Sequence, residues 1–215
     1  MRTPHLLLLA MTMLLLAAIP ASADSILVDN GAIDGNTNAY SINYGYSVSN
    51  SFDLSTTQMI TGLVFGSWLL STDLPQTIDW QITANDPFTG NIVAGGSTAD
   101  LTSTFQFTNS YGFDIYSSLF PIMNVSLPAG DYWFQLGNGV TSLGLPMFWD
   151  QSNGPASASQ FDGVNISPLA YTDPLSSQGF SGSESFQILT PEPGTMALLG
   201  SGLVLAGFLR RKKSR

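Results

Sequence analysis

The stretch Ile78-Asp79-Trp80-Gln81-Ile82-Thr83 decides the fold class, because apolar and polar residues alternate along it one by one. A β-strand points successive side chains to opposite faces of its sheet, so this pattern predicts a strand with one buried and one exposed face. Trp80 belongs to the apolar set and is expected in the core. The same alternation occurs in residues 40–48, 101–108 and 132–136.

Further strands are predicted where short apolar runs lie between turn signals, and no stretch shows the 3.6-residue apolar period of a helix. These runs are Ser25–Val28, Ile60–Leu69, Ile92–Ser97, Ile122–Leu127, Leu145–Trp149 and Glu184–Leu189. Gly137-Asn138-Gly139 is a turn signal, and residues 154–183 are predicted to form a long loop. The pattern predicts an all-β body that folds as a single antiparallel β-sandwich, jelly-roll-like or immunoglobulin-like, with closure into a barrel as the alternative.

The charges of the chain are segregated. Its 215 residues include six Lys and Arg, one His and no Cys, and all six bases lie close to the two ends of the sequence. Fourteen of the 15 carboxylates, all except Glu192, lie between Asp24 and Thr190, where there is no Lys, Arg, His or Cys. This body therefore has a formal charge of −14.

That composition excludes several classes of function for residues 24–190. Nucleic-acid binding requires Lys and Arg to displace counterions from phosphates, so no nucleic-acid partner is expected. A Ser-His-Asp triad, a Cys nucleophile, a Schiff-base Lys and a His or Cys zinc site are excluded, because the residues that they need are missing. We therefore expect a body that is not an enzyme and needs no cofactor.

Residues 1–23 read as a secretory signal peptide. Arg2 supplies a positive start, Leu6–Ile19 is almost entirely apolar, and Pro20 ends that run. Ala21 and Ala23 are the small residues that a signal peptidase accepts, so cleavage is expected after Ala23. An uncleaved N-terminal anchor is the alternative. The leader predicts that residues 24–190 fold outside the cytoplasm.

The last 25 residues, 191–215, have three parts. Pro191-Glu192-Pro193 is followed by the apolar run Thr195–Leu209, which would span about 22 Å as a helix and predicts a short transmembrane segment. A basic end follows, which should stop the segment in the membrane and stay in the cytoplasm. Its cations are Arg210, Arg211, Lys212, Lys213 and Arg215. An ordinary single-pass anchor is the alternative.

This arrangement resembles the sorting signal of the PEP-CTERM family of exported bacterial proteins. The resemblance implies processing by an exosortase at or near Pro191, Glu192 and Pro193. It also implies a transient inner-membrane precursor, final delivery to the cell surface or the extracellular space, and an association with exopolysaccharide. The stretches 29–33, 148–158 and 184–189 resemble the bodies of such proteins only loosely, and that likeness implies no activity.

Three hypotheses follow for the body. The first is a structural or adhesive surface protein associated with exopolysaccharide. The second is a carbohydrate-binding module near Trp149, Asp150 and Asn153, with calcium as an open ligand because residues 29–38 and 150–153 are rich in oxygen donors. Trp133 alternates with Tyr132 and Phe134, so the strand has one face with Trp133 and one with Tyr132 and Phe134. One of these two faces is expected to be exposed. The third hypothesis is a glycoside hydrolase that uses two of the Asp residues.

Overall fold

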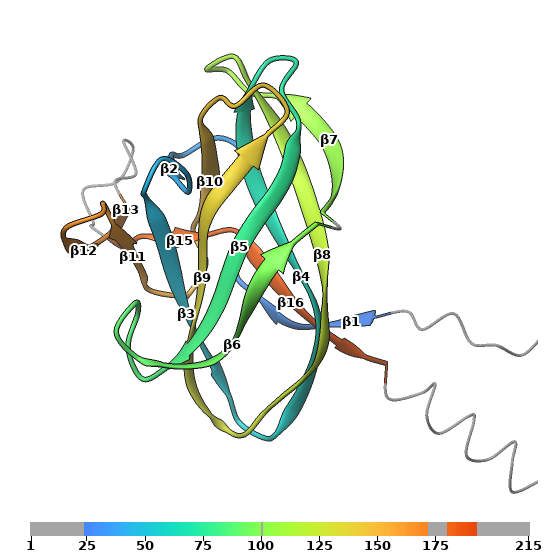
Figure 1. Ribbon diagram of the computed structural model, residues 1–215, viewed down its shortest axis with the longest axis vertical. Coiled ribbons are helices and arrows are strands. Elements are labelled where there is room, and N and C mark those ends of the chain that lie inside the picture. The colour runs from blue at the N-terminus through green and yellow to red at the C-terminus, as the bar shows by residue number, and fades with distance from the viewer. Residues whose placement is uncertain (1–23, 100, 172–179, 193–215) are drawn as a thin grey trace, which may run out of the picture. The chain divides into compact units, whose positions relative to one another are not determined.

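The computed structural model describes residues 24–99, 101–171 and 180–192, and the regular structure within these ranges consists of β-strands (Figure 1). The all-β, antiparallel part of the prediction is confirmed, whereas the jelly-roll-like or immunoglobulin-like topology stays a prediction. The predicted signal peptide, 1–23, and the predicted membrane helix, 195–209, lie outside the described residues. Within the described ranges there is no helix that is long and apolar enough to cross a membrane.

The larger sheet has eight strands and is built around β4 (Gln58–Leu70). Its main order is β1 (Asp24–Asp29), β16 (Phe186–Pro191), β4, β10 (Met147–Ser152) and β15 (Ser183–Glu184). Three strands lie off this path. They are β2 (Ala39–Ser41) on β10, β8 (Phe113–Leu127) on β4, and β7 (Thr102–Thr108) on β8.

The smaller sheet has six strands and faces the larger one through the core. Its order is β12 (Ile166–Pro168), β11 (Ala158–Phe161), β3 (Ser47–Leu54), β9 (Gly130–Thr141), β5 (Pro75–Ala84) and β6 (Asn91–Thr98). A short pair, β13 (Ala170–Tyr171) with β14 (Phe180–Ser181), stands apart from both. Figure 1 shows the long strands β4, β5, β8 and β9 curling around a common interior.

The core forms where the apolar faces of the two sheets meet, and Trp149 of β10 lies at its centre with none of its surface exposed. Its indole contacts Phe65 of β4 and Phe186 of β16 in its own sheet, with ring centroids 6.3 and 6.2 Å away. Phe134 of β9 approaches from the opposite sheet at 5.5 Å. Trp80 of β5 is also buried, as predicted. Burying each such side chain contributes about 1.5–3 kcal/mol, so these rings join the sheets strongly.

Residues 40–48 do not form the single strand that their alternation predicts. The chain turns between β2 and β3, where Tyr44 and Gly45 both have positive φ and the Tyr46 amide donates to the Asn43 carbonyl at 3.1 Å. Two positive φ values inside a four-residue turn favour a tight reversal over an extended strand. A polar-apolar alternation cannot distinguish a strand from two strand ends joined by such a turn.

Two predicted loops contain strands. Gly137-Asn138-Gly139 lies inside β9, where a Cβ on Gly137 would approach Ser47 Oγ to 2.3 Å, so that glycine permits close packing against β3. Residues 154–183 contain β11 and β12, which reverse at Asp162-Gly163, and Gly163 has a φ of 91°. Gly137 thus permits close packing inside a long strand, whereas β11 and β12 are too short for an alternation to be visible.

Candidate functional site

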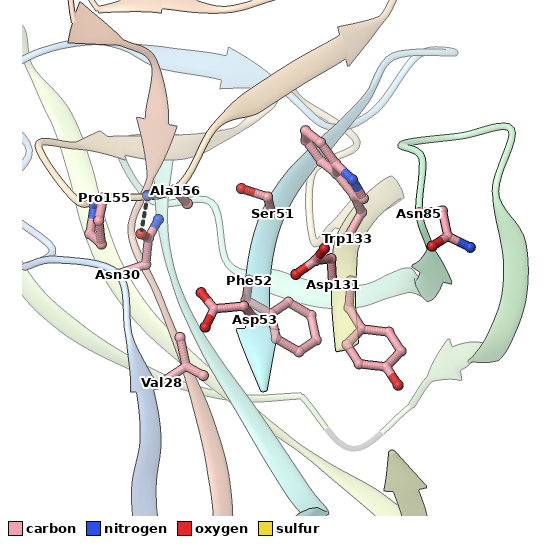
Figure 2. Close-up of a pocket in the computed structure, with 11 residues that line it drawn as sticks. Val28, Asn30, Ser51, Phe52, Asp53, Asn85, Asp131, Trp133, Pro155 and Ala156 are labelled. Carbon is pink, nitrogen blue, oxygen red and sulfur yellow. Dashed lines mark hydrogen bonds between the residues drawn. The ribbon is translucent and has the colours of Figure 1, made fainter. Parts of the chain in front are cut away.

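A cleft of about 430 Å³ opens beside the outward face of β3 and β9 in the six-stranded sheet (Figure 2). We call it the β3–β9 cleft. Its lining combines an aromatic ring, carboxylates, amides and a hydroxyl. The lining residues are Val28, Asn30, Ser51, Phe52, Asp53, Asn85, Asp131, Tyr132, Trp133, Pro155 and Ala156.

Trp133 supplies the accessible aromatic surface of this cleft. Its neighbours in β9, Tyr132 and Phe134, are 6% and 0% exposed and point into the core, so the alternation turns Trp133 outward, where it is half-buried. Trp133 lies opposite Ser51 of β3 and Thr83 of β5. Of the two faces that the sequence left open for β9, the structure exposes the one with Trp133.

Asp53 of β3 and Asp131 of β9 are direct register partners across the antiparallel pair, so both carboxylates project from the same face of the sheet. Figure 2 shows the two carboxyl groups in the cleft, with the Trp133 indole above them in this view. Both residues are exposed. Among residues 24–99, 101–171 and 180–192, neither side chain has a hydrogen-bond or ion-pair partner. Adjacent like charges repel, so the unliganded cleft holds an unbalanced negative charge.

The turn after β5 carries Asn85 to the rim of the cleft. Asn85 has a φ of 73°, a conformation that Asn tolerates better than most residues, and its amide donates to the Asp131 carbonyl at 3.3 Å. Thr83 Oγ1 donates to the Asp86 carbonyl at 2.8 Å. A Cβ on Gly90 would lie 2.3 Å from the Ala84 carbonyl oxygen, so this turn requires glycine there. These contacts hold the backbone of Asn85 against β9, and its side chain is part of the cleft lining.

The opposite wall is fixed by Asn30, which is 1% exposed. Its Oδ1 accepts from the Ala156 amide at 3.0 Å, and its Nδ2 donates to the Glu184 carbonyl at 2.7 Å. A Cβ on Gly154 would lie 2.2 Å from the Asn30 carbonyl oxygen, so the 153–156 segment can approach only because residue 154 is glycine. These contacts fix the backbone of the 153–156 segment against Asn30.

Trp149, Asp150 and Asn153, predicted as a ligand site, do not form one exposed surface. Trp149 is in the core, and its Nε1 donates to the Ser185 carbonyl at 2.8 Å. Asp150 is fully buried and accepts from Trp68 Nε1 at 2.5 Å and from the Asp34 and Gly35 amides at 3.1 Å each. Only Asn153 is exposed. Trp149 and Asp150 thus hold the fold together, and the tryptophan that lies half-buried on an outward sheet face is Trp133.

The two oxygen-rich loops considered for calcium do come together, but through amide donors. Residues 34 and 35 present N–H groups to Asp150, while Asp29 and Asp34 accept from amides within their own turns, those of Gly31 and Asn36. No cluster of three or more His, Cys, Asp or Glu side chains suited to a metal ion occurs in the part of the chain that the structure describes. Calcium binding stays a prediction, without a built site in these loops.

Two buried carboxyl groups lie close to one another in β10 and β15. Burial raises the pKa of Asp150 to about 6, although the Trp68 hydrogen bond opposes the shift. Burial also raises the pKa of Glu184 well above its ordinary value, and the nearby Asp150 charge adds to this effect. Neither Glu184 oxygen has a partner in the described structure. Both groups lie beneath the surface, so they belong to the interior and not to the β3–β9 cleft.

The C-terminal motif begins at the end of the last strand. Pro191 is the final residue of β16 and Glu192 is exposed, whereas Pro193 and the basic residues of the tail lie outside the described residues, as do Ala21 and Ala23 of the leader. The family model for the PEP-CTERM protein-sorting motif matches residues 189–213. The chain carries a PEP-CTERM sorting signal. A search of curated proteins finds no match to the chain.

The PEP-CTERM motif implies an exported surface protein that is anchored transiently in the membrane and processed by an exosortase. The match begins at Leu189, so its first three residues, Leu189, Thr190 and Pro191, are also the last three of β16. Folded body and sorting signal therefore share residues, and the chain has no linker between them.

Proposed function

We propose that residues 24–190 act outside the cell as a non-enzymatic structural or adhesive domain that binds glycan of the surrounding exopolysaccharide through the β3–β9 cleft. The PEP-CTERM signal supports the destination, because it implies delivery to the surface. The half-buried Trp133 carries the glycan part of the proposal. An aromatic face next to carboxylate, amide and hydroxyl groups suits a sugar ring, which has both C–H faces and hydroxyl edges.

The same cleft supports binding better than hydrolysis. Asp53 and Asp131 stand side by side on neighbouring strands, and both are open to solvent. A glycosidase keeps its general acid protonated in an apolar setting and holds the sugar between its two carboxyls. The alternative of a hydrolase predicts the release of reducing ends from the polysaccharide, which can be measured in the binding samples.

Co-sedimentation of the full chain, in neutral detergent, with exopolysaccharide from the producing cells tests this function. Trp133→Ala should lower the bound fraction at least several-fold without unfolding the protein, because the side chain points away from the core. Tyr46→Ala is the matched control, because Tyr46 is exposed and does not line the cleft. Equal binding by wild type and Trp133→Ala would refute the assignment of the cleft.

A further inference from the structure

The charge of the β3–β9 cleft constrains which glycan it can accept. Asp53 and Asp131 project next to one another without a hydrogen-bond or ion-pair partner in the part of the chain that the structure describes, and the sequence from 24 to 190 contains no Lys, Arg or His that could neutralise them. An acidic sugar would bring further negative charge to this pair and would be repelled. The cleft should therefore discriminate against uronic acids and sulfated sugars.

A cationic ligand, by contrast, relieves the repulsion between the two carboxylates. The Trp133 indole stands two residues along β9 from Asp131 on the same face, and the face of an indole attracts cations. A single ammonium group could thus contact a carboxylate pair and an aromatic face together. Charge-assisted hydrogen bonds of this type are about twice as strong as neutral ones.

A bare divalent metal fits the cleft less well than an organic ammonium. Calcium takes about 6–8 oxygen ligands, and the described part of the chain does not gather a third acidic side chain or a histidine at this pair. An amino sugar carries its own hydroxyl groups, which the Asn85 amide and the Ser51 hydroxyl can meet at the rim. The cleft volume of about 430 Å³ lies in the range of small-molecule sites.

We infer that the β3–β9 cleft recognises amino sugars with a free, protonated amine, such as the units of a de-N-acetylated hexosamine polymer, through Asp53, Asp131 and Trp133. This inference rests on the proposed glycan-binding function and names its ligand class. In the bound state the amine lies between the two carboxylates, and the sugar ring packs against the indole.

Calorimetric titration of the full chain in neutral detergent tests the ligand class. The probes are a glucosamine tetramer and the N-acetylglucosamine tetramer of the same linkage, at about pH 5.5, where the amines of the glucosamine tetramer are protonated. The glucosamine tetramer should bind at least about 10-fold more tightly, and added salt should weaken its binding, as expected for an exposed ionic contact.

The double variant Asp53→Asn with Asp131→Asn should abolish this preference. The control is the double variant Asp24→Asn with Asp86→Asn, which removes the same amount of charge from two exposed residues outside the cleft. This control should still prefer the glucosamine tetramer. Circular dichroism melting checks the fold, and the Asn pair should melt no lower than wild type because the repulsion is removed. If the pair fails to fold, Asp53→Asn alone should still reduce the preference.

The outcomes separate this inference from the proposed function. Equal affinity for the two tetramers, or an unchanged preference in the Asn pair, would overturn the amino-sugar assignment and leave glycan binding through Trp133 intact. Binding to the native polysaccharide but to neither tetramer would also overturn it. Binding to no glycan at all would overturn the proposed function together with the inference.

Discussion

Glu184 is fully buried opposite Gln151, its register partner in β10, and the body offers no basic residue to balance its charge. The titratable groups near it are Asp150, whose charge raises the pKa of Glu184 further, and Tyr40, whose own pKa is raised by burial and by Glu184. An ionised carboxylate here would have neither a counter-charge nor a hydrogen-bond donor in the described structure. The folded protein therefore favours the protonated form.

Stability should accordingly fall as the pH rises. The folded pKa values of Asp150 and Glu184 exceed those of the unfolded chain, so the folded state binds protons more tightly. Their contribution is fully present below about pH 4 and is lost as the pH passes about 6 for Asp150 and higher for Glu184. The Asp150 shift alone corresponds to about 3 kcal/mol. Thermal melts should give a lower Tm at about pH 8 than at about pH 4.5, and equal values would contradict this account.

Glu184→Gln isolates the effect of one carboxyl. The amide keeps the shape of the side chain and cannot ionise, so the variant should melt higher than wild type at about pH 8 and close to wild type at about pH 4.5. Asp86→Asn, at an exposed turn, serves as the control and should not change the pH dependence. A Glu184→Gln protein whose Tm falls with pH as steeply as wild type would show that another group is responsible.

At the level of single residues, the alternation correctly predicted that Trp80 is buried, whereas Trp149, the tryptophan singled out as a candidate for ligand binding, is buried as well. Trp80 sits in a clear alternating strand, so its face could be assigned. Trp149 was favoured because a loop follows it, but β10 lies between β4 and β15 and its residues are covered on both faces. The usable signal was in β9, where Tyr132, Phe134 and Leu136 define the inner face and leave Trp133 outside.

β16 is the element that connects the fold to the sorting signal. It lies between β1 and β4, and its Phe186 and Ile188 are buried in the core. Residues 186–189 pair with β4, so the strand pairing reaches Leu189, the first residue of the sorting motif. Any cut upstream of residue 189 would remove part of this strand, so processing that preserves the fold has to occur beyond it.

Replacing Ile188, one of the buried side chains of β16, should destabilise the body. Ile188→Ala should lower the free energy of unfolding by about 2–5 kcal/mol, because it removes buried methylene groups and leaves a cavity. Gln187→Ala, the neighbour on the opposite face, should change it by less than about 1 kcal/mol. Urea denaturation of the two full-length variants measures both free energies of unfolding. Equal denaturation midpoints for Ile188→Ala and Gln187→Ala would show that β16 is not part of the cooperative fold.

The elements that the sequence predicted well are those with clean alternation, such as β5 and β7, or with a short apolar run between clear turn signals, such as β4 and β6. β8 extends from Phe113 to Leu127, whereas only residues 122–127 were predicted. In its first half Ile115 and Tyr116 are both buried, although neighbouring residues of a strand point to opposite faces. The segment around Gly35 covers the face that carries Ile115, so both faces are buried there and the two-residue period disappears.

The whole molecule assembles a cleft from segments that lie far apart in the sequence. Asp53 and Asp131 become neighbours only through the register of β3 with β9, and Asn30 and Ala156 complete the wall through one hydrogen bond. Composition predicted an acidic body without the Lys, Arg, His and Cys side chains on which many catalytic sites depend. It could not predict which two of the carboxylates would meet, because strand register is a property of the folded sheet.

The PEP-CTERM motif implies that this acidic β-body is exported and then released from a tail that begins at its last strand. Mass spectrometry of the protein from cells with and without the exosortase tests it most directly. With the enzyme, the C-terminus should lie at or just beyond the Pro191–Pro193 motif, with β16 kept and the basic end lost. Without the enzyme, the chain should still end at Arg215. A C-terminus at Arg215 in both strains, or a cut upstream of Leu189, would contradict the account.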